Sequence, residues 1–334
     1  AFLVSSGIGA FLVPFLRKIK AGQAIREDGP RWHMSKSGTP TMGGLMFIAA
    51  IAVVCLTVGF EPMMNGEYGH IFCFIFALIF GAIGFLDDYE KLRKKQNLGL
   101  SAKSKFLLQL VAALAFVFLM RRTGYVTTNL YIPFWNVVKP LPEAVYFIFA
   151  AFVIVGTVNS VNLTDGVDGL AAGTSIPVCL FFAVLTYVWG TEFLALGIFA
   201  SAIAGGLLGF LVYNFNPAKI FMGDTGALLL GYVLSTVSVV GMFKFYAIVT
   251  FIVPILALFL PLFDTTCAFF RRLLRGQSPM HPDRGHLHHR LIDMGLSQKQ
   301  AVAILYSISA ILGLCAVVLA TSGTVRLYLV VIAA

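Results

Sequence analysis

The sequence has few charged residues. Only 12% of its 334 residues are Asp, Glu, Lys or Arg, whereas 59% are hydrophobic and the mean hydropathy is +0.89. A soluble domain averages about 25% charged residues, so the composition excludes an ordinary soluble protein. It predicts an all-α polytopic membrane protein that forms one integral membrane domain over residues 1–334, with the lipid bilayer as the solvent for most side chains.

Several common motifs are also missing. The five cysteines contain no Cys-x-x-Cys pair, are odd in number and lie in or beside apolar segments, so we expect neither a disulfide nor a cysteine metal site. No Walker A motif occurs, and no nucleophilic Ser or Cys constellation is evident. The first apolar segment lacks the features of a cleavable signal peptide. It starts without a Met, and we expect a few residues to precede it.

Long apolar segments dominate what is present. A spanning helix needs about 20 mostly apolar residues, and we count about ten such spans. The ninth contains Pro254 and Pro261 and is expected to be kinked or broken. The tail, 325–334, could begin an eleventh span. The ten expected spans are 1–16, 43–60, 71–86, 104–120, 144–161, 171–189, 194–213, 226–242, 245–270 and 302–321.

Lys and Arg are distributed unevenly between the loops. The loops that follow odd-numbered spans hold 19 of these 24 residues, and the opposite side holds 5. Cytoplasmic loops carry the excess of positive charge. The odd-numbered loops are therefore predicted to be cytoplasmic and the N-terminus to lie outside.

Two adjacent acids mark the end of the third expected span. Asp87 and Asp88 follow an apolar run that ends at Leu86, and a basic cluster begins at Lys91. Acids at a helix C-terminus oppose the helix dipole, and adjacent carboxylates repel unless a metal or cations neutralise them. They are either ordinary polar residues at a helix end or part of a Mg²⁺ site that also holds substrate phosphates.

Two further acidic loops are predicted on the same side. "NSVNLTDGVDGLAAG" (159–173) supplies carboxamides and carboxylates suited to a nucleobase or sugar, although Asp-Gly is also ordinary turn chemistry. In "FMGDTG", Gly223 and Gly226 allow close approach of the backbone to a ligand. Asp224 in that motif is either a metal ligand or the N-cap of the next helix.

A histidine-rich loop follows the ninth span. "HPDRGHLHHRL" contains His286, His288 and His289 with Arg284 and Arg290 beside them. An anion-binding patch for phosphate is favoured over zinc, and the alternative is a solvated basic loop. Asp264, in the ninth span, either lines a polar cavity or is satisfied by a neighbouring threonine.

The first loop, "HMSKSGTPTMGGLMF" (33–47), adds Lys36 and Thr41 before a helix start that could offer amides to phosphate. Four loops from distant parts of the chain therefore converge on one membrane face. Carboxylates for Mg²⁺, cations for phosphate and a membrane edge together indicate phosphoryl transfer to or from a lipid. A transporter for a phosphorylated lipid is the non-enzyme alternative, but transporters usually place ionisable groups near the bilayer midplane.

Four of these stretches carry a family resemblance. They are "GQAIREDGPRWHMSKSGTPTMGG", "GFLDDYEKLRKKQNLGLSAKSK", "VNLTDGVDGLAAG" and "FMGDTGALLLG". Across nearly its whole length the chain resembles the polyprenyl-phosphate N-acetylhexosamine-1-phosphate transferases. Its N-terminal part is most similar to the branch that transfers phospho-MurNAc-pentapeptide. The resemblance implies a homodimeric enzyme of ten helices in the bacterial inner (plasma) membrane, with its active site facing the cytoplasm.

The resemblance also implies the reaction and the residues that carry it out. UDP-MurNAc-pentapeptide and undecaprenyl phosphate would give lipid I and UMP, with Mg²⁺ on Asp224. The partners are thus these two substrates and the lipid bilayer, and no nucleic-acid partner is expected. The implied catalytic residues are Asp87, Asp88, Asp224, His286, His288 and His289. The implied substrate-binding residues are Lys36, Thr41, Lys91, Lys103, Asn162, Asp165, Asp168, Asn214 and Phe221, the last as a ring that stacks on uridine.

One stretch departs from this branch. The pentapeptide transferases typically end with three consecutive histidines followed by Phe-Glu, whereas this chain has "HPDRGHLHHRLIDMGLSQKQA". That motif resembles relatives that transfer GlcNAc-1-phosphate to a polyprenyl phosphate for teichoic acid or O-antigen synthesis. Such a UDP-GlcNAc transferase is therefore the alternative function.

Overall fold

The computed structural model describes residues 1–18, 38–94, 96, 99–132, 137–190, 193–242, 259–274 and 286–320. Most of these residues are helical, and the strands among them form one short hairpin. The elements are α1 (Phe2–Lys18), α2 (Gly44–Thr57), α3 (Phe60–Met64), α4 (Gly69–Lys94), α5 (Ala102–Arg122), β1 (Asn129–Ile132), β2 (Val137–Pro140), α6 (Glu143–Thr164), α7 (Leu170–Trp189), α8 (Leu194–Asn214), α9 (Gly223–Met242), α11 (Phe259–Leu274), α12 (Leu287–Asp293) and α13 (Gln298–Ala320).

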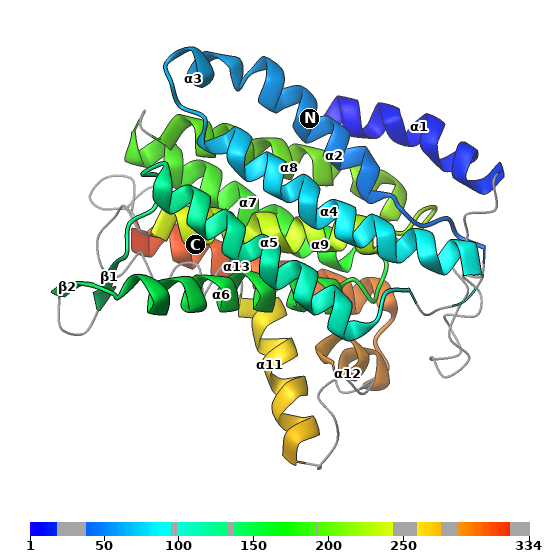
Figure 1. The fold of residues 1–334 in the computed structure, drawn as a ribbon. Helices are drawn as coiled ribbons and strands as arrows, with labels where there is room; N and C mark the ends of the chain where they lie inside the picture. Colours follow the sequence, from blue (N-terminus) through cyan, green and yellow to red (C-terminus); the bar gives the residue numbers. More distant parts are fainter. Residues whose placement is uncertain are drawn as a thin grey trace.

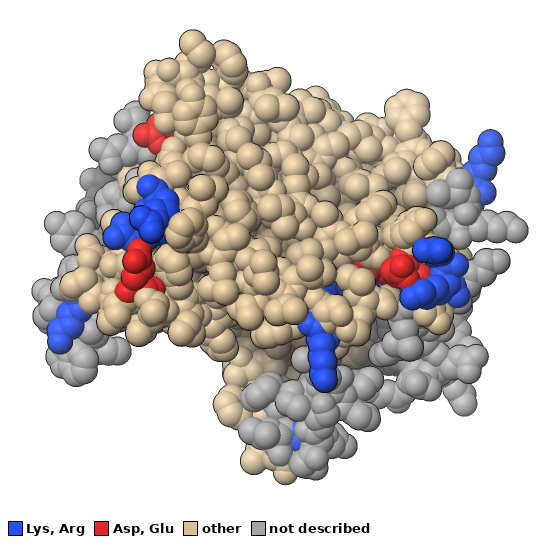
Figure 2. Space-filling view, viewed as in Figure 1, with Lys and Arg blue, Asp and Glu red and all other residues tan. Residues whose placement is uncertain are grey.

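The long helices form a bundle from which α11 projects to one side (Figure 1). Within the described ranges, six segments are long and apolar enough to cross a membrane: α4, α5, α6, Leu170–Val188, α8 and Gln298–Val318. Charged side chains gather at two opposite ends of the visible face, and a broad uncharged surface separates them (Figure 2). The prediction of an all-α polytopic membrane protein is confirmed. The count of ten spans stays a prediction.

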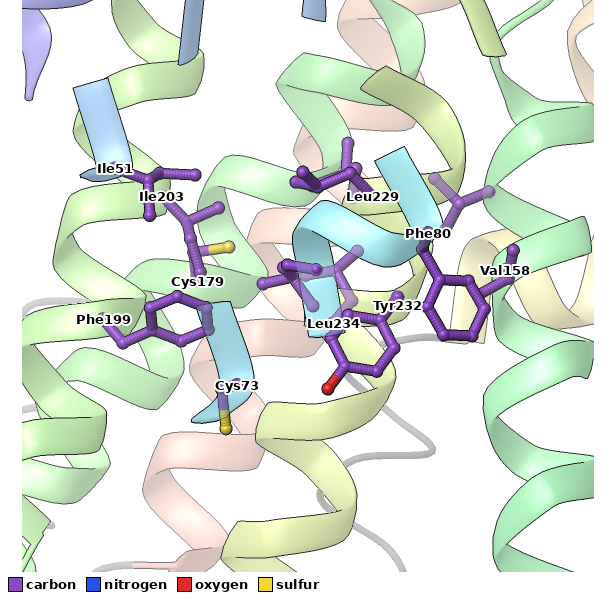
Figure 3. Packing of buried hydrophobic residues seen from close by; sticks show 14 of the residues in the cluster. Ile51, Cys73, Phe80, Val158, Cys179, Phe199, Ile203, Leu229, Tyr232 and Leu234 are labelled. Carbon is purple, nitrogen blue, oxygen red and sulfur yellow. The ribbon is translucent and has the colours of Figure 1, made fainter. Parts of the chain in front are cut away.

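The core of the bundle lies around α9, which packs against both α4 and α6. Tyr232 of α9 stacks on Phe80 of α4 with ring centroids 4.6 Å apart, and its ring meets the edge of Phe116 of α5 at 5.4 Å. Val158 of α6 lies on the far side of Phe80 (Figure 3). Aromatic rings at these separations pack favourably beyond the area they bury. They fix α4 and α9 side by side.

Helix α4 extends further than the sequence predicts. The third span was expected to end at Leu86, but the helix runs without a break to Lys94. Asp87 and Asp88 therefore lie inside a helix, and it is Lys91, Arg93 and Lys94 that occupy its last turn. The helix dipole favours cations at the C-terminal end. The prediction that Asp87 and Asp88 oppose the dipole at the C-terminus of their helix is thus wrong.

A two-stranded hairpin between α5 and α6 is absent from the sequence-based prediction. Strands β1 and β2 are antiparallel, with Asn129 opposite Pro140 and Ile132 opposite Val137. Strands of four residues carry little pattern of their own. The hairpin joins the end of α5 to the start of α6. The opposite ends of these two helices lie near Asp87, so the hairpin is at the far end of the bundle from that residue.

Part of the ninth expected span and the C-terminal tail lie outside the described residues. Of the former, 245–270, only residues 259–270 are described, within α11, and Pro261 lies in the first turn of that helix. The predicted kink or break of the span and the possible eleventh span therefore stay predictions.

Candidate active site

Three carboxylates from two helices converge near one end of the bundle. Asp87 and Asp88 of α4 and Asp224 of α9 each offer an oxygen, and these oxygens lie within 4.8 Å of one another. Asp87 and Asp88 are only 3% and 2% exposed. Gly84, one turn earlier in α4, lets the helices approach, because a Cβ there would collide with the backbone of Asp224. Within the described residues, this is the one group of three such side chains that could hold a metal ion.

Asp88 caps helix α9 from a different helix. Its Oδ1 accepts a hydrogen bond from the Asp224 N–H at 3.1 Å. Its Oδ2 accepts from the N–H of Thr225 at 2.9 Å and from the Thr225 hydroxyl at 2.7 Å. The first N–H groups of a helix need such acceptors, and a negative charge there is favourable. Asp88 thus holds Asp224 in place.

Two lysines neutralise the other two acids. Lys91 Nζ lies 2.6 Å from Asp87 Oδ2 and 2.9 Å from Asp224 Oδ2. Lys105 Nζ lies 2.6 Å from Asp224 Oδ2 and 3.9 Å from Asp87 Oδ2. Asp87 Oδ1 also accepts the N–H of Leu100 at 2.8 Å. Lys91 and Lys105 thus place two positive charges against the acids, and such cations are suited to pairing with phosphate oxygens.

Lys103 was the sequence-based candidate on α5, and the structure brings a different lysine to the acids. The side chain of Lys103 is exposed, whereas Lys105 is largely buried against Asp224. Two positions along a helix differ by about 200° around its axis, so only one of the two lysines can face the bundle. The rotation of α5 decides which one, and the sequence alone does not show it.

The end of α6 supplies Asn162 and Asp165. With its amide turned so that the nitrogen faces the acid, Asn162 donates to Asp224 Oδ1 at 3.0 Å and accepts from Lys105 Nζ at 3.2 Å. Asp165 follows the helix as its C-cap. Burial, and then the carboxylates of Asp224, Asp88 and Asp168, raise the pKa of Asp165 well above its usual range. Asn162 and Asp165 thus adjoin the acidic cluster, and their contact with the substrate stays a prediction.

The side chains of Asp168 and Asn214 form hydrogen bonds between the α6–α7 turn and the α8–α9 connection. Asp168 Oδ2 accepts from Asn216 Nδ2 at 3.0 Å and from the Ala218 N–H at 3.1 Å. Asn214 accepts the N–H of Gly169 at 3.0 Å and donates to the carbonyl of Ile220 at 2.9 Å. Both side chains are buried. Their observed contacts hold the α6–α7 turn against the α8–α9 connection, and a direct contact with uridine stays a prediction.

The segment before α2 lies against the start of α9. Phe221 donates its N–H to Pro40 at 2.8 Å and accepts from Gly43 at 2.8 Å. Thr41 is 4% exposed, and its hydroxyl has no hydrogen-bond partner among the described residues. That hydroxyl and Asp88 Oδ2 both lie within 2.7 Å of where a Cβ on Gly223 would be. An orphaned hydroxyl at this point fits a site that receives a ligand. Lys36 lies outside the described residues.

The histidines pack together near the Asp165 turn. His286 and His288 are buried and their rings stack at 5.7 Å, while the rings of His288 and His289 are 4.2 Å apart. A Cβ on Gly166 would lie 3.5 Å from His288 Nε2. His288 therefore lies beside the loop that adjoins the acids, and His286 and His289 pack against His288.

Asp264 is a site residue whose partner the sequence did not reveal. Its carboxylate contacts His286 and Leu287, not the neighbouring threonines considered above. These residues are more than 20 positions apart, so no local pattern could indicate the contact.

Comparisons with known proteins identify the family of this chain. The family model described as "Glycosyl transferase family 4" matches residues 70–242, and "Phospho-N-acetylmuramoyl-pentapeptide-transferase signature 1" matches residues 36–48. A phospho-N-acetylmuramoyl-pentapeptide-transferase of Staphylococcus aureus (strain MSSA476) is 39% identical over 320 residues, which cover 94% of this chain and 95% of the relative. That of Staphylococcus carnosus (strain TM300) is 44% identical over 241 residues, or 72% and 74% of the two chains.

These matches cover both the acidic helices and the segment before α2. The chain belongs to glycosyl transferase family 4 and, within it, to the family of the phospho-N-acetylmuramoyl-pentapeptide-transferases. It is therefore a phospho-sugar transferase built as a multi-pass membrane protein.

Proposed function

We propose that this enzyme transfers phospho-MurNAc-pentapeptide from UDP-MurNAc-pentapeptide to undecaprenyl phosphate, giving lipid I and UMP. The observation that carries the proposal is the lysine-flanked cluster of Asp87, Asp88 and Asp224 at one end of an apolar bundle. A lipid phosphate and a water-soluble diphosphate can meet at such a place. The 39% identity with a transferase of that name over 94% of the chain supports this choice of donor.

The residues present fit Mg²⁺ as the cofactor. Three carboxylates supply the oxygen ligands that this ion prefers, and it usually keeps further positions for water and substrate phosphates. Asp224 would hold it, with Asp87 beside Asp224; Asp88 also serves as the α9 cap. When bound, the ion neutralises charge that develops on the diphosphate oxygens.

The protein's own groups would bind and orient both substrates. Lys91 and Lys105 would pair with phosphate oxygens, and Thr41 would donate its free hydroxyl nearby. His286 and His288 would face the donor from the Asp165 side. A phosphate monoester has a second pKa of about 6, so most of the acceptor is already dianionic at neutral pH. Asp87 would therefore orient the acceptor more than remove a proton from it.

The cellular setting belongs to the same proposal. The excess of Lys and Arg in the odd-numbered loops supports a site on the cytoplasmic face of the bacterial inner membrane. We expect the enzyme to act as a homodimer.

A radiolabelled lipid-product assay tests the proposal. Purified protein in lipid is incubated with Mg²⁺, undecaprenyl phosphate and either UDP-MurNAc-pentapeptide or UDP-GlcNAc, with Asp224→Asn as the inactive control. Lipid product with the first donor and its loss on addition of EDTA support the proposal. Product with UDP-GlcNAc alone would overturn the choice of donor and support the UDP-GlcNAc transferase. No lipid product with either donor would favour a transporter.

A further inference from the structure

Asp264 joins helix α11 to the start of α12. Its Oδ2 lies 3.0 Å from His286 Nδ1, and its Oδ1 accepts the N–H of Leu287 at 2.8 Å. His286 is the N-cap residue of α12, but its own side chain makes no capping hydrogen bond. One carboxylate from α11 thus receives both the first N–H of α12 and the ring of the residue before it.

The contact fixes the tautomer of His286. The side chains of Asp264 and His286 are only 12% and 8% exposed, and a buried carboxylate is costly unless its oxygens accept hydrogen bonds. An ionised carboxylate can only accept, so His286 carries a proton on Nδ1. In the neutral ring, Nε2 is then the free acceptor.

His286 in turn supports His288. The two rings are nearly parallel, with 7° between their planes. A Cβ on Gly166, the residue after Asp165, would lie 3.5 Å from His288 Nε2, so His288 packs beside this turn. A change in the orientation of His286 would therefore move the imidazole that adjoins the acidic loop.

Among the described residues, the cavity that Asp264 lines has a volume of about 10 Å³, which is the space of a single water at most. Its lining comes from α6, α7, α11, α12 and α13. The lining residues are Thr164, Leu170, Asp264, Leu287, His288 and Leu305. Any effect of Asp264 on the reaction must pass through the residues it holds.

We propose that Asp264 is a positioning residue for the transfer reaction, which fixes the tautomer and orientation of His286 and thereby holds His288 against the turn after α6. This inference rests on the proposed function, in which the histidines face the phosphate donor. The Asp264 carboxylate would act on the reaction indirectly, because its hydrogen bonds go to His286 and to the start of α12.

Asp264→Asn tests the role of the carboxylate. The Asn oxygen can still accept from Leu287, but its NH₂ group then faces His286 Nδ1 and favours the opposite tautomer. We expect kcat/KM for the donor to fall about 10-fold or more, while the thermal midpoint stays near that of the wild type. Asp293→Asn is the matched control, since it removes the same charge from an exposed position at the end of α12, and it should keep wild-type kinetics.

A double variant distinguishes positioning from simple support of the fold. If Asp264 acts through His286, then Asp264→Asn combined with His286→Ala is no slower than His286→Ala alone. Losses that multiply, or wild-type kinetics for His286→Ala, would overturn the proposal. If Asp264→Asn does not fold, Asp264→Glu replaces it in the same comparison.

A measurement without substrate separates this inference from the proposed function. The ¹⁵N spectrum of histidine-labelled protein in micelles reports the tautomer of each ring, and the signal missing in His286→Ala assigns His286. The wild type should show the Nδ1–H form and Asp264→Asn the Nε2–H form. An unchanged tautomer overturns the positioning role whether or not either donor is a substrate.

Discussion

Asp87 is the residue at which two mechanisms can be separated. As a base it would matter most when the acceptor phosphate is still protonated, whereas as an orienting group it would matter at every pH. Its contacts, to Lys91 and to the N–H of Leu100, fix its position. They favour the orienting role.

We expect Asp87→Asn to lower kcat about 100-fold by a factor that is the same from pH 6 to pH 9. Activity is measured across that range at saturating acceptor, with the wild type as the reference for each pH. A steep loss at pH 6 that recovers toward pH 9, where the acceptor is fully dianionic, would instead identify Asp87 as an essential base.

The two lysines at the start of α5 provide a matched pair. Lys105 contacts Asp224 and Lys103 is exposed. We therefore expect Lys105→Ala to reduce kcat/KM about 100-fold, while Lys103→Ala stays within about 2-fold of the wild type. A larger loss for Lys103→Ala would mean that substrate binding rotates α5.

The sequence reveals some site residues and hides others for identifiable reasons. Asp87, Asp88 and Asp224 stand out because a carboxylate in an apolar segment is costly. Lys103 and Lys105 are equivalent in sequence, and only the rotation of α5 distinguishes them. The Asp264–His286 contact joins two helices across a connection, so no local pattern predicts it.

At the level of elements, the site depends on how closely α4 approaches the start of α9. The sequence predicts both helices but not their contact, because Gly84 is one of several glycines in apolar segments. In the structure, a side chain at Gly84 would meet the backbone of Asp224 and Thr225. That backbone cannot move without losing its cap, Asp88.

Gly84→Ala should therefore destabilise the protein by about 1–3 kcal/mol and reduce activity as the acids separate. Gly156→Ala is the control, since a Cβ at this helical position in α6 meets nothing within 4 Å. It should be neutral or slightly stabilising. Thermal unfolding in detergent measures both. Equal midpoints for the two variants would contradict the close approach of α4 and α9.

At the level of the whole molecule, orientation in the membrane is one prediction that remains to be tested. The hairpin that holds Lys139 and the loop that precedes α5 lie at opposite ends of that helix. If the positive loops are cytoplasmic, these two positions lie on opposite sides of the membrane.

Single cysteines introduced as Lys103→Cys and Lys139→Cys into a variant without the five native cysteines test this. A membrane-impermeant thiol reagent should label Lys139→Cys in intact cells and Lys103→Cys only in inverted vesicles. Both positions are exposed in the structure, so each is reachable from its own side. The reverse pattern would place the acidic site outside the cell.

The length of α4 sets the height of the acids relative to the membrane surface, so the thickness of the bilayer should affect activity. Asp87 lies 18 residues after Gly69 in a helix of 26 residues, which is ~27 Å along the axis at about 1.5 Å per residue. The hydrocarbon layer is about 30 Å thick. With Gly69 at the opposite membrane surface and α4 along the membrane normal, the acids would stand near the height at which lipid headgroups begin. In a thicker bilayer the acceptor's phosphate would lie further from the bilayer centre than the carboxylates, and in a thinner bilayer it would lie closer to the centre than they do. Acyl-chain length should therefore tune turnover with no change in the protein at all.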